Sequence, residues 1–238
     1  MKRISYSTFK QILKSPAHYK WAVEHPPEPT PAMEFGRLLH KAVLEPKKYQ
    51  EESAKLIEEA STAKKLASLE KQKETIEGIA NAVLAHKEAS QLIASAQHEV
   101  VIEWDHENLP YKGVLDALIP NKAILDLKTC TDASRRGAER ATLDYQYYLQ
   151  AALYLEGVQE QATPQQIDTF YLLYVEKEPP YGVALYRLNE EWLEMGRMQL
   201  AQARELLNWC LQNNQWPSYQ PFGNVEDLGV PRYASYKL

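Results

Sequence analysis

Three consecutive segments near the middle of the chain predict β-strands: the side chains of the first and third alternate between two faces with a period of 2, and the second carries one acid among apolar residues. These segments cover residues 98–104, 111–119 and 123–129. Pro120 and Asn121 separate the second segment from the third, and both residue types favour turns. The pattern therefore predicts a β-hairpin that follows a first strand, and so a sheet of at least three antiparallel strands.

Three charged side chains lie among the apolar residues of this hairpin: Asp116 on its first arm, and Asp126 and Lys128 on its second. Because successive side chains of a strand point to opposite faces, Asp126 and Lys128 face the same side. Two carboxylates and an ammonium are costly to bury unless they are paired or bind a metal. An Asp-x-Lys pair by itself is more often a surface ion pair. The hydrophobic sequence on either side favours a functional site here.

Two further strands are predicted at 168–175 and 181–188, with a turn at Pro179–Pro180 between them. The tail after residue 214 is rich in proline and tyrosine, and we expect it to wrap around the body. Helical spacing of apolar residues predicts the remaining elements, which are a short helix capped by Ser7, a second helix that starts at Ser15–Pro16, a helix that ends before Pro46, two or three helices within 47–97, one helix from about 138 to 156 that ends at Gly157, and a helix over 190–210 capped by Asn189.

These elements predict a single α/β domain. Its centre is a mixed, largely antiparallel β-sheet of about five strands flanked by α-helices. The helical N-terminal part covers 1–97, the sheet and one helix cover 98–190, and the last helix and tail cover 191–238.

Composition narrows the classes of function. The hydrophobic fraction of 45% and the charged fraction of 25% are ordinary for a globular protein. The formal net charge of −5 means that any nucleic-acid site must be a local basic patch. Cys130 and Cys210 are the two cysteines, too few for a four-cysteine metal cluster. The chain lacks a signal-peptide pattern and an apolar run of about 18 residues, so we expect a soluble, cytoplasmic protein with no membrane partner.

Gly36 and His40 lie four residues apart in a predicted helix and therefore share one face. A glycine inside a helix costs about 0.5–1 kcal/mol relative to alanine, so Gly36 is expected to mark a close backbone contact. His40 has two interpretations. It is either a hydrogen-bonded core histidine or a neutral imidazole that binds a metal or positions a substrate.

Other polar residues are candidates for binding. Glu99 and Glu103 fall on one face of the first predicted strand, and either could support a second metal ion. Three arginines flank Gly137 and could grip phosphates, although a solvated basic loop explains them equally well: Arg135, Arg136 and Arg140. Gln150 and Tyr154 lie four apart and share a helix face.

Taken in order, these motifs resemble the PD-(D/E)xK nucleases. The motifs are Gly36-x-x-x-His40, Asp116, Asp126-x-Lys128 and Gln150-x-x-x-Tyr154. The resemblance is greatest to the RecB-like branch that includes the RecE-type and phage, lambda-exonuclease-like, enzymes, because the opening SYSTFKQILKSPAHYKWA and the late WPSY and VPRYA are also similar. Leu115 stands where the family pattern has a proline, and Asp126 where it often has glutamate. The resemblance implies a restriction-endonuclease-like core.

The resemblance also implies a metal site. Asp116, Asp126, the Leu127 carbonyl and His40 would hold Mg²⁺, an ion that prefers oxygen ligands. Imidazole suits Mn²⁺ better, so Mn²⁺ is an alternative ion. Lys128 would orient or deprotonate the attacking water, or stabilise the charge that develops in the reaction.

By the same resemblance, Gln150 and Tyr154 would position the DNA strand near the metal. Arg37, beside the glycine–histidine motif, and the three arginines of 135–140 would contact phosphates, including a 5′-phosphate.

The implied activity is an exonuclease that degrades one strand of linear double-stranded DNA from its 5′ end and leaves a 3′ overhang. Such enzymes form trimeric or tetrameric rings and act with a single-strand annealing recombinase. Two alternatives stay open: an endonuclease of the same fold, and a non-catalytic DNA-binding or assembly module.

Overall fold

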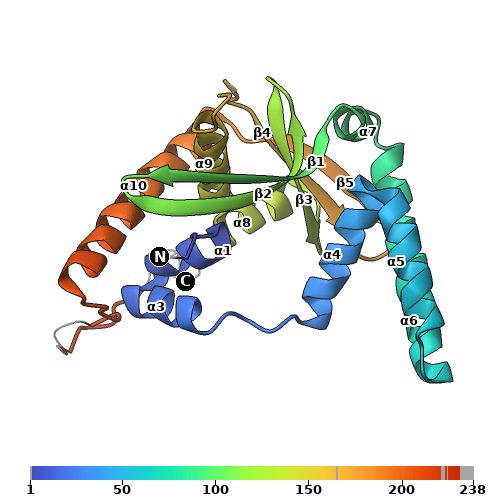
Figure 1. Cartoon of the computed structure of the whole chain (residues 1–238), viewed down its shortest axis with the longest axis horizontal. Coiled ribbons are helices and arrows are strands. Elements are labelled where there is room, and N and C mark those ends of the chain that lie inside the picture. Colours follow the sequence, from blue (N-terminus) through green and yellow to red (C-terminus); the bar gives the residue numbers. More distant parts are fainter. Residues whose placement is uncertain (1, 165, 221–222, 224, 231–238) are drawn as a thin grey trace.

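A five-stranded mixed sheet forms the centre of the molecule, as the strand pattern predicted (Figure 1). The strands follow one another in sheet order as β1 (Gln97–His106), β2 (Leu109–Ile119), β3 (Ala123–Cys130), β4 (Phe170–Glu176) and β5 (Val183–Arg187). Strands β3 and β4 are parallel, and the other neighbouring pairs are antiparallel. The computed structural model describes residues 2–164, 166–220, 223 and 225–230.

Helices cover both faces of this sheet and also form the N-terminal region. Before the sheet come α1 (Tyr6–Phe9), α2 (Gln11–Lys14), α3 (Pro16–Glu24), α4 (Pro31–Leu44), α5 (Pro46–Glu58), α6 (Ala63–Ala85) and α7 (Lys87–Ala94). Later come α8 (Arg135–Asp144) and α9 (Tyr147–Gln159) between β3 and β4, and α10 (Glu190–Asn213) after β5. None of the helices in these described ranges is long and apolar enough to cross a membrane.

Two hydrophobic cores lie on opposite faces of the sheet. Ile124 of β3 belongs to the core that α1–α3, α9 and α10 share. Its neighbours Leu125 and Leu127 belong to the core that α4, α6 and α7 cover. This alternation along β3 is the one expected for a strand buried on both faces.

The single helix predicted from about 138 to 156 is wrong, because the chain forms α8 and α9 instead. The break falls at Tyr145 and Gln146, where Gln146 adopts the left-handed conformation with φ of 60°. The Tyr6 hydroxyl donates hydrogen bonds to the carbonyl oxygens of Tyr145 and Gln146, at 2.6 and 3.1 Å. The Leu149 N–H, which a continuous helix would direct to the Tyr145 carbonyl, bonds to the Gln146 carbonyl at 2.9 Å instead. The Tyr145 carbonyl takes its partner from the N-terminus, which local sequence cannot indicate.

Gly157 does not end α9, which continues to Gln159. A Cβ at this position would lie 2.8 Å from Ile102 Cδ1 and from the Trp104 ring, so the glycine allows the helix to pack closely on β1.

The structure confirms two of the three predicted helix caps. Ser15 and Asn189 cap α3 and α10 through hydrogen bonds from the backbone N–H groups of His18 and Trp192. The first helix is capped by Ser5 rather than Ser7, and it splits into α1 and α2 at Lys10.

Among the residues that the structure describes, the beginning of the tail packs on the body. Trp216 stacks on Tyr19 with ring centroids 5.9 Å apart, and the Pro217 carbonyl accepts the Ala17 N–H at 3.1 Å. Val225 and Leu228 are fully exposed, so the expected wrap does not extend to them. The end of the VPRYA motif, within 231–238, lies outside the described residues.

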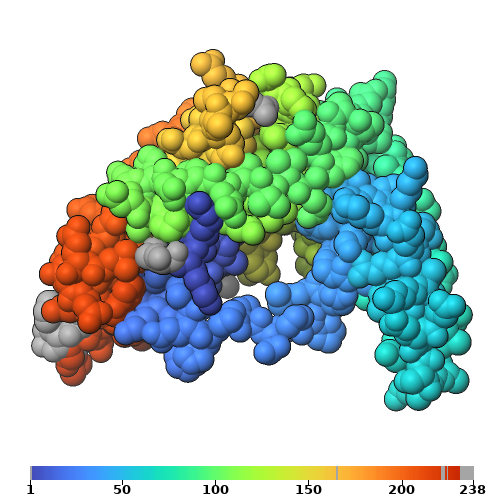
Figure 2. All heavy atoms as spheres, viewed as in Figure 1, coloured from blue at the N-terminus to red at the C-terminus, as the bar shows by residue number. Residues whose placement is uncertain are grey.

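The N-terminal helices leave an opening beneath the sheet. Figure 2 shows it between β1–β2 (green) and the blue segment that joins α3 to α4. α1 and α4 stand on either side of this opening in Figure 1. The space under the sheet is therefore bordered by segments from both ends of the helical region.

Gly196 and Gly36 provide a matched test of the packing. A Cβ at 196 would overlap the Tyr148 carbonyl oxygen and lie 2.9 Å from Ala152 Cβ, whereas a Cβ at 36 would meet no atom within 4 Å. The close contact expected at Gly36 is therefore absent. We predict that Gly196→Ala lowers the free energy of unfolding by about 1–3 kcal/mol, and that Gly36→Ala raises it by about 0.5–1 kcal/mol. Urea denaturation measures both, and equal effects would contradict this packing of α9 on α10.

Candidate active site

The Asp116 carboxylate lies where β2 and β3 separate. The β2–β3 ladder pairs Ile119 with Ala123 and ends at the pair of Ala117 with Leu125. Beyond this pair the Leu127 N–H donates to Asp116 Oδ2 at 2.7 Å. The Asp116 side-chain oxygen thus accepts the Leu127 N–H in place of a backbone carbonyl of the neighbouring strand. This bond holds the carboxylate firmly between the two strands.

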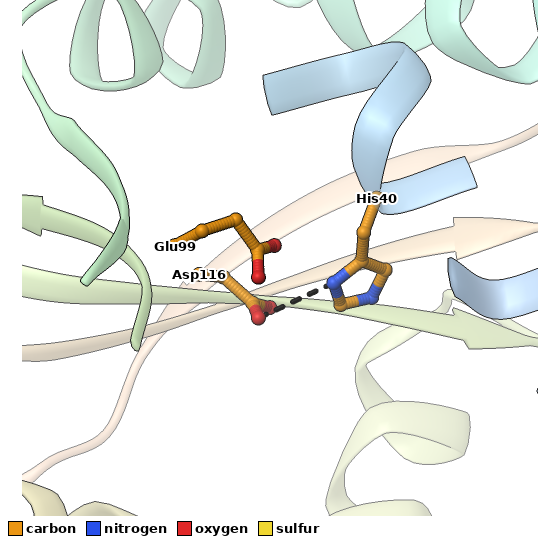
Figure 3. Close-up of side chains that lie close together, drawn as sticks. All are labelled: His40, Glu99 and Asp116. Carbon is orange, nitrogen blue, oxygen red and sulfur yellow. Dashed lines mark ion pairs between the residues drawn. The ribbon is translucent and has the colours of Figure 1, made fainter. Parts of the chain in front are cut away.

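His40 and Glu99 complete a group around this carboxylate (Figure 3). His40 Nδ1, from α4, lies 3.2 Å from Asp116 Oδ1. The potential ligand atoms of His40, Glu99 and Asp116 all lie within 4.8 Å of one another. The His40 ring therefore faces the Asp116 carboxylate, with the Glu99 carboxylate close by.

An irregular backbone brings Glu99 into this group. The register of β1 with β2 pairs His98 with Ala117 and Val100 with Leu115, and skips the intervening Glu99 and Asp116. Glu99 has a φ of 51°, a left-handed conformation that costs a non-glycine residue roughly 1–2 kcal/mol. Glu103 lies four residues further along β1, about 13 Å away in an extended strand. Glu103 instead pairs with Arg3 at 3.0 Å and Lys112 at 3.8 Å, away from the site.

Asp126 and Lys128 form a second group on β3. Lys128 Nζ lies 2.6 Å from Asp126 Oδ2, so the two side chains share a face as predicted. Gln150, from α9, donates to Asp126 Oδ1 at 2.7 Å and accepts from Lys128 Nζ at 3.1 Å. The Lys128 ammonium also lies 4.4 Å from the centre of the Tyr147 ring.

The two groups meet through β3, because the Leu127 N–H held by Asp116 follows directly after Asp126. Asp126 does not join the three-residue group, since its carboxylate is turned toward Lys128 and Gln150. Its buried Oδ2 lies 2.6 Å from the Lys128 ammonium, which forms an ion pair with it. Carboxylate oxygens are also the ligands that hard divalent cations prefer.

The chain matches a family model described as "PDDEXK-like domain of unknown function (DUF3799)" over residues 5–226. The chain belongs to this family. A crystal structure from Eubacterium rectale, described as a "putative exonuclease", has a TM-score of 0.68 at 14% identity, covering 99% of this chain and 93% of that one. The crystal structure of SSO0001 has a TM-score of 0.32 at 18% identity, covering 87% and 85%. Comparison with curated proteins gave no match.

PDDEXK nucleases generally depend on a divalent metal, and the residues of this site fit one. Carboxylate oxygens suit Mg²⁺ and Mn²⁺, and an imidazole suits Mn²⁺. In the structure Glu99, His40 and Asp116 are closest to sharing one ion. The sequence prediction grouped Asp126 with Asp116 and His40, and kept Glu99 as an optional ligand of a second ion.

The pKa values of the buried charged groups show how burial and neighbouring charges oppose each other. Burial raises the pKa of Asp126 to about 6, against the opposing effect of the Lys128 ammonium. Burial also disfavours the Asp116 carboxylate, but the charge and hydrogen bond of His40, the charge of Lys128 and the Leu127 N–H together lower the pKa of Asp116. For Lys128, the charges of Asp126 and Asp116 outweigh burial and raise its pKa. The ammonium thus serves as counter-charge to both carboxylates.

Sequence reasoning missed Lys10. Burial, and after it the charge of Lys128, lowers the pKa of Lys10, so the two ammonium groups repel each other. Lys10 Nζ is 5.2 Å from the Tyr6 ring centre. Nothing in the N-terminal sequence pattern connects Lys10 with the hairpin, because only the packing of α1 under the sheet brings them together.

Tyr154 is buried beside the second group, and burial followed by the Asp126 charge raises its pKa to about 12. A Cβ at Gly113 would lie 3.0 Å from the Tyr154 ring, so the absence of a side chain at Gly113 allows the ring to pack there.

The predicted phosphate-binding arginines lie further out. Arg37 is held by Glu34 and Glu52. Arg135 and Arg140 are exposed on α8 and pair with Glu139 and Asp144, and Arg136 is also exposed.

Metal binding should stabilise the protein. At a concentration about 100 times Kd, a bound ion adds about 2.7 kcal/mol, which corresponds to roughly 5–10 °C in Tm for a chain of this size. We predict this shift with Mg²⁺ or Mn²⁺, its loss in Asp116→Asn, and its persistence in Glu103→Gln, all measured by thermal denaturation against chelator. The same shift in Asp116→Asn would contradict the site.

The raised pKa of Asp126 predicts a pH dependence of stability in the metal-free protein. A carboxyl with a higher pKa in the folded state binds more protons when folded, so unfolding becomes easier as pH rises from 3.8 to about 6. We expect the wild type to lose about 1–3 kcal/mol relative to Asp126→Asn between pH 4 and 7. Urea unfolding in chelator tests this, and a constant difference across that range would count against it.

Proposed function

We propose that this protein is a metal-dependent exodeoxyribonuclease that degrades one strand of linear double-stranded DNA. The observation that carries the proposal is the convergence of Asp116, Asp126 and Lys128 on adjacent strands, with His40 and Glu99 beside them. Membership of a PDDEXK-like family supports hydrolysis of a phosphodiester bond.

His40, Glu99 and Asp116 would hold a divalent ion, together with Asp126 and the Leu127 carbonyl. When bound, such an ion polarises the phosphate and lowers the pKa of a water molecule. Lys128 has a raised pKa in the metal-free site, which supports a role as a charged donor over a role as general base. Its ammonium would orient the attacking water or stabilise charge on the phosphate. Lys10 would add a second positive charge on the same side.

Gln150 positions the lysine. Its amide bonds to both Asp126 and Lys128 and thereby keeps their separation constant. We propose that Gln150 acts through Lys128, and that Tyr154 and Gly36 line the path of the DNA. A helical glycine with no atom within 4 Å of its missing side chain leaves space on the His40 face of α4.

Preference for ends over closed circles is supported by the opening under the sheet. The segment between α3 and α4 borders this opening on the side away from the sheet (Figure 2), and we propose that a strand with a free end enters there. The printed description of the Eubacterium rectale protein points in the same direction. Polarity from the 5′ end, a 3′ overhang, an oligomeric ring and an annealing partner are proposed from the sequence resemblance.

One assay tests this proposal: linear duplexes labelled at the 5′ or the 3′ end and a closed circle, each incubated with Mg²⁺, Mn²⁺ or chelator. We expect metal-dependent release from the 5′-labelled end and an intact circle. Asp126→Asn and Lys128→Ala should lower the rate by roughly 100- to 1,000-fold or more, while Glu103→Gln retains it.

Wild-type rates in either site variant would refute the assignment. Cutting of the closed circle would replace the exonuclease by an endonuclease, and binding of DNA without hydrolysis in any metal would favour a non-catalytic module. Circular dichroism of each variant checks that lost activity is not lost folding.

A further inference from the structure

A cavity of about 470 Å³ lies beside the candidate active site, at the ends of β3 and β4 and against α8. Its volume falls in the range of small-ligand sites, about 300–1,000 Å³. The parallel pair β3–β4 places it at the carboxyl ends of the two strands, where α/β folds commonly bind ligands. Its lining includes Thr129, Thr131, Arg140, Tyr145, Tyr147 and Lys177.

A row of aromatic rings connects this cavity with the catalytic lysine. The Tyr147 ring lies 4.4 Å from Lys128 Nζ and lines the cavity. Tyr145 stacks on Tyr147 with centroids 5.6 Å apart and an angle of 27° between the rings. Tyr145 is 57% exposed, so its ring contributes little to the core.

The exposed ring is nevertheless held in place. The Tyr145 carbonyl accepts the Tyr6 hydroxyl at 2.6 Å, and the next residue, Gln146, is in the left-handed conformation with φ of 60°. That conformation costs roughly 1–2 kcal/mol in a non-glycine residue. A fixed backbone that presents an aromatic face to solvent beside a cavity is suited to stacking with a planar ligand.

Two cationic and two acidic side chains line the cavity. Arg140 pairs with Asp144 at 3.3 Å. Asp132 accepts the Ser134 N–H at 2.9 Å, and hydrogen bonds from Ser134 lower its pKa, so it keeps its negative charge. Lys177 is exposed at the cavity, and among the described residues no carboxylate forms an ion pair with it. The Lys177 ammonium and the exposed Tyr145 ring match the two parts of a nucleotide.

We propose that this cavity is a nucleotide subsite for the DNA strand that is being cut. The base of a nucleotide that flanks the scissile phosphate stacks on Tyr145, and its phosphate contacts Lys177. Tyr147 lies between this nucleotide and Lys128, so the subsite sets the position of the strand relative to the lysine. The inference rests on the proposed nuclease function and adds residues that the sequence motifs do not contain.

Fluorescence of 2-aminopurine tests the stacking of a base on Tyr145 without hydrolysis of the DNA, because the fluorescence is quenched when this base stacks. Tailed duplexes carry the probe at successive positions from the end, and they are bound in chelator or with Ca²⁺ in place of Mg²⁺. We expect quenching at one position in the wild type and in Tyr145→Phe, which keeps an aromatic ring. Tyr145→Ala should lose it. Tyr219→Ala, at a tyrosine that is 63% exposed and contacts His18 instead, should retain it.

Kinetics give a second measurement. Tyr145→Ala should raise KM about 10-fold, within the range for loss of one base–aromatic stack, and change kcat little. An abasic residue at the quenched position should impair the wild type by a similar factor and leave Tyr145→Ala unaffected. Lys177→Ala should weaken binding and reduce its salt dependence by about one phosphate contact. Lys122→Ala, at the turn between β2 and β3, is the control.

The outcomes separate this inference from the proposed function. If Tyr145→Ala hydrolyses DNA with the KM of the wild type and quenches 2-aminopurine as the wild type does, the subsite is overturned and the nuclease assignment stays in place. Position-specific quenching that Tyr145→Ala abolishes, in a protein that hydrolyses no DNA, would support the subsite and refute the nuclease. Competition by a free deoxynucleoside monophosphate as strong as that by the strand would show a mononucleotide site and overturn the assignment to the strand.

Discussion

The hydrogen bond from the Leu127 N–H to the Asp116 carboxylate is the contact on which the candidate site depends. It forms because β2 and β3 separate after the pair of Ala117 with Leu125, which leaves a backbone donor without a strand partner. The carboxylate that fills this place is anchored by the backbone of β3. From there it reaches His40 on its other oxygen, while the next side chains of β3 form the group around Lys128.

This arrangement is costly for the fold and useful for binding. Two buried carboxylates are balanced by one lysine and one histidine, and burial still raises the pKa of Asp126 to about 6. Well-packed apolar residues would often be at least as stable as such a buried ion network. The strained φ of Glu99 adds to the cost. Deviations of this kind gather at functional sites, where a cation or a substrate supplies the missing compensation.

The candidate site was predictable where its residues follow local rules. Strand alternation places Asp126 and Lys128 on one face, and helical spacing places Gln150 on the packed side of α9. Glu99 had two possible roles in the sequence, and alternation alone grouped it with Glu103. In the structure Glu99 joins His40 and Asp116, while Glu103, four residues further along β1, pairs with Arg3. Lys10 carried no signal, because its approach to Lys128 depends on the packing of α1.

The sequence by itself determined the five strands, their central hairpin and the caps at Ser15 and Asn189, because alternation, turn residues and capping act between close neighbours. Only the tertiary structure decided where the long predicted helix breaks, because the Tyr6 hydroxyl that binds the Tyr145 carbonyl comes from the other end of the chain. It also decided which carboxylates share a site, since that depends on how far β2 and β3 separate. Contacts between residues far apart in sequence form only when the whole core packs, and no local pattern records them.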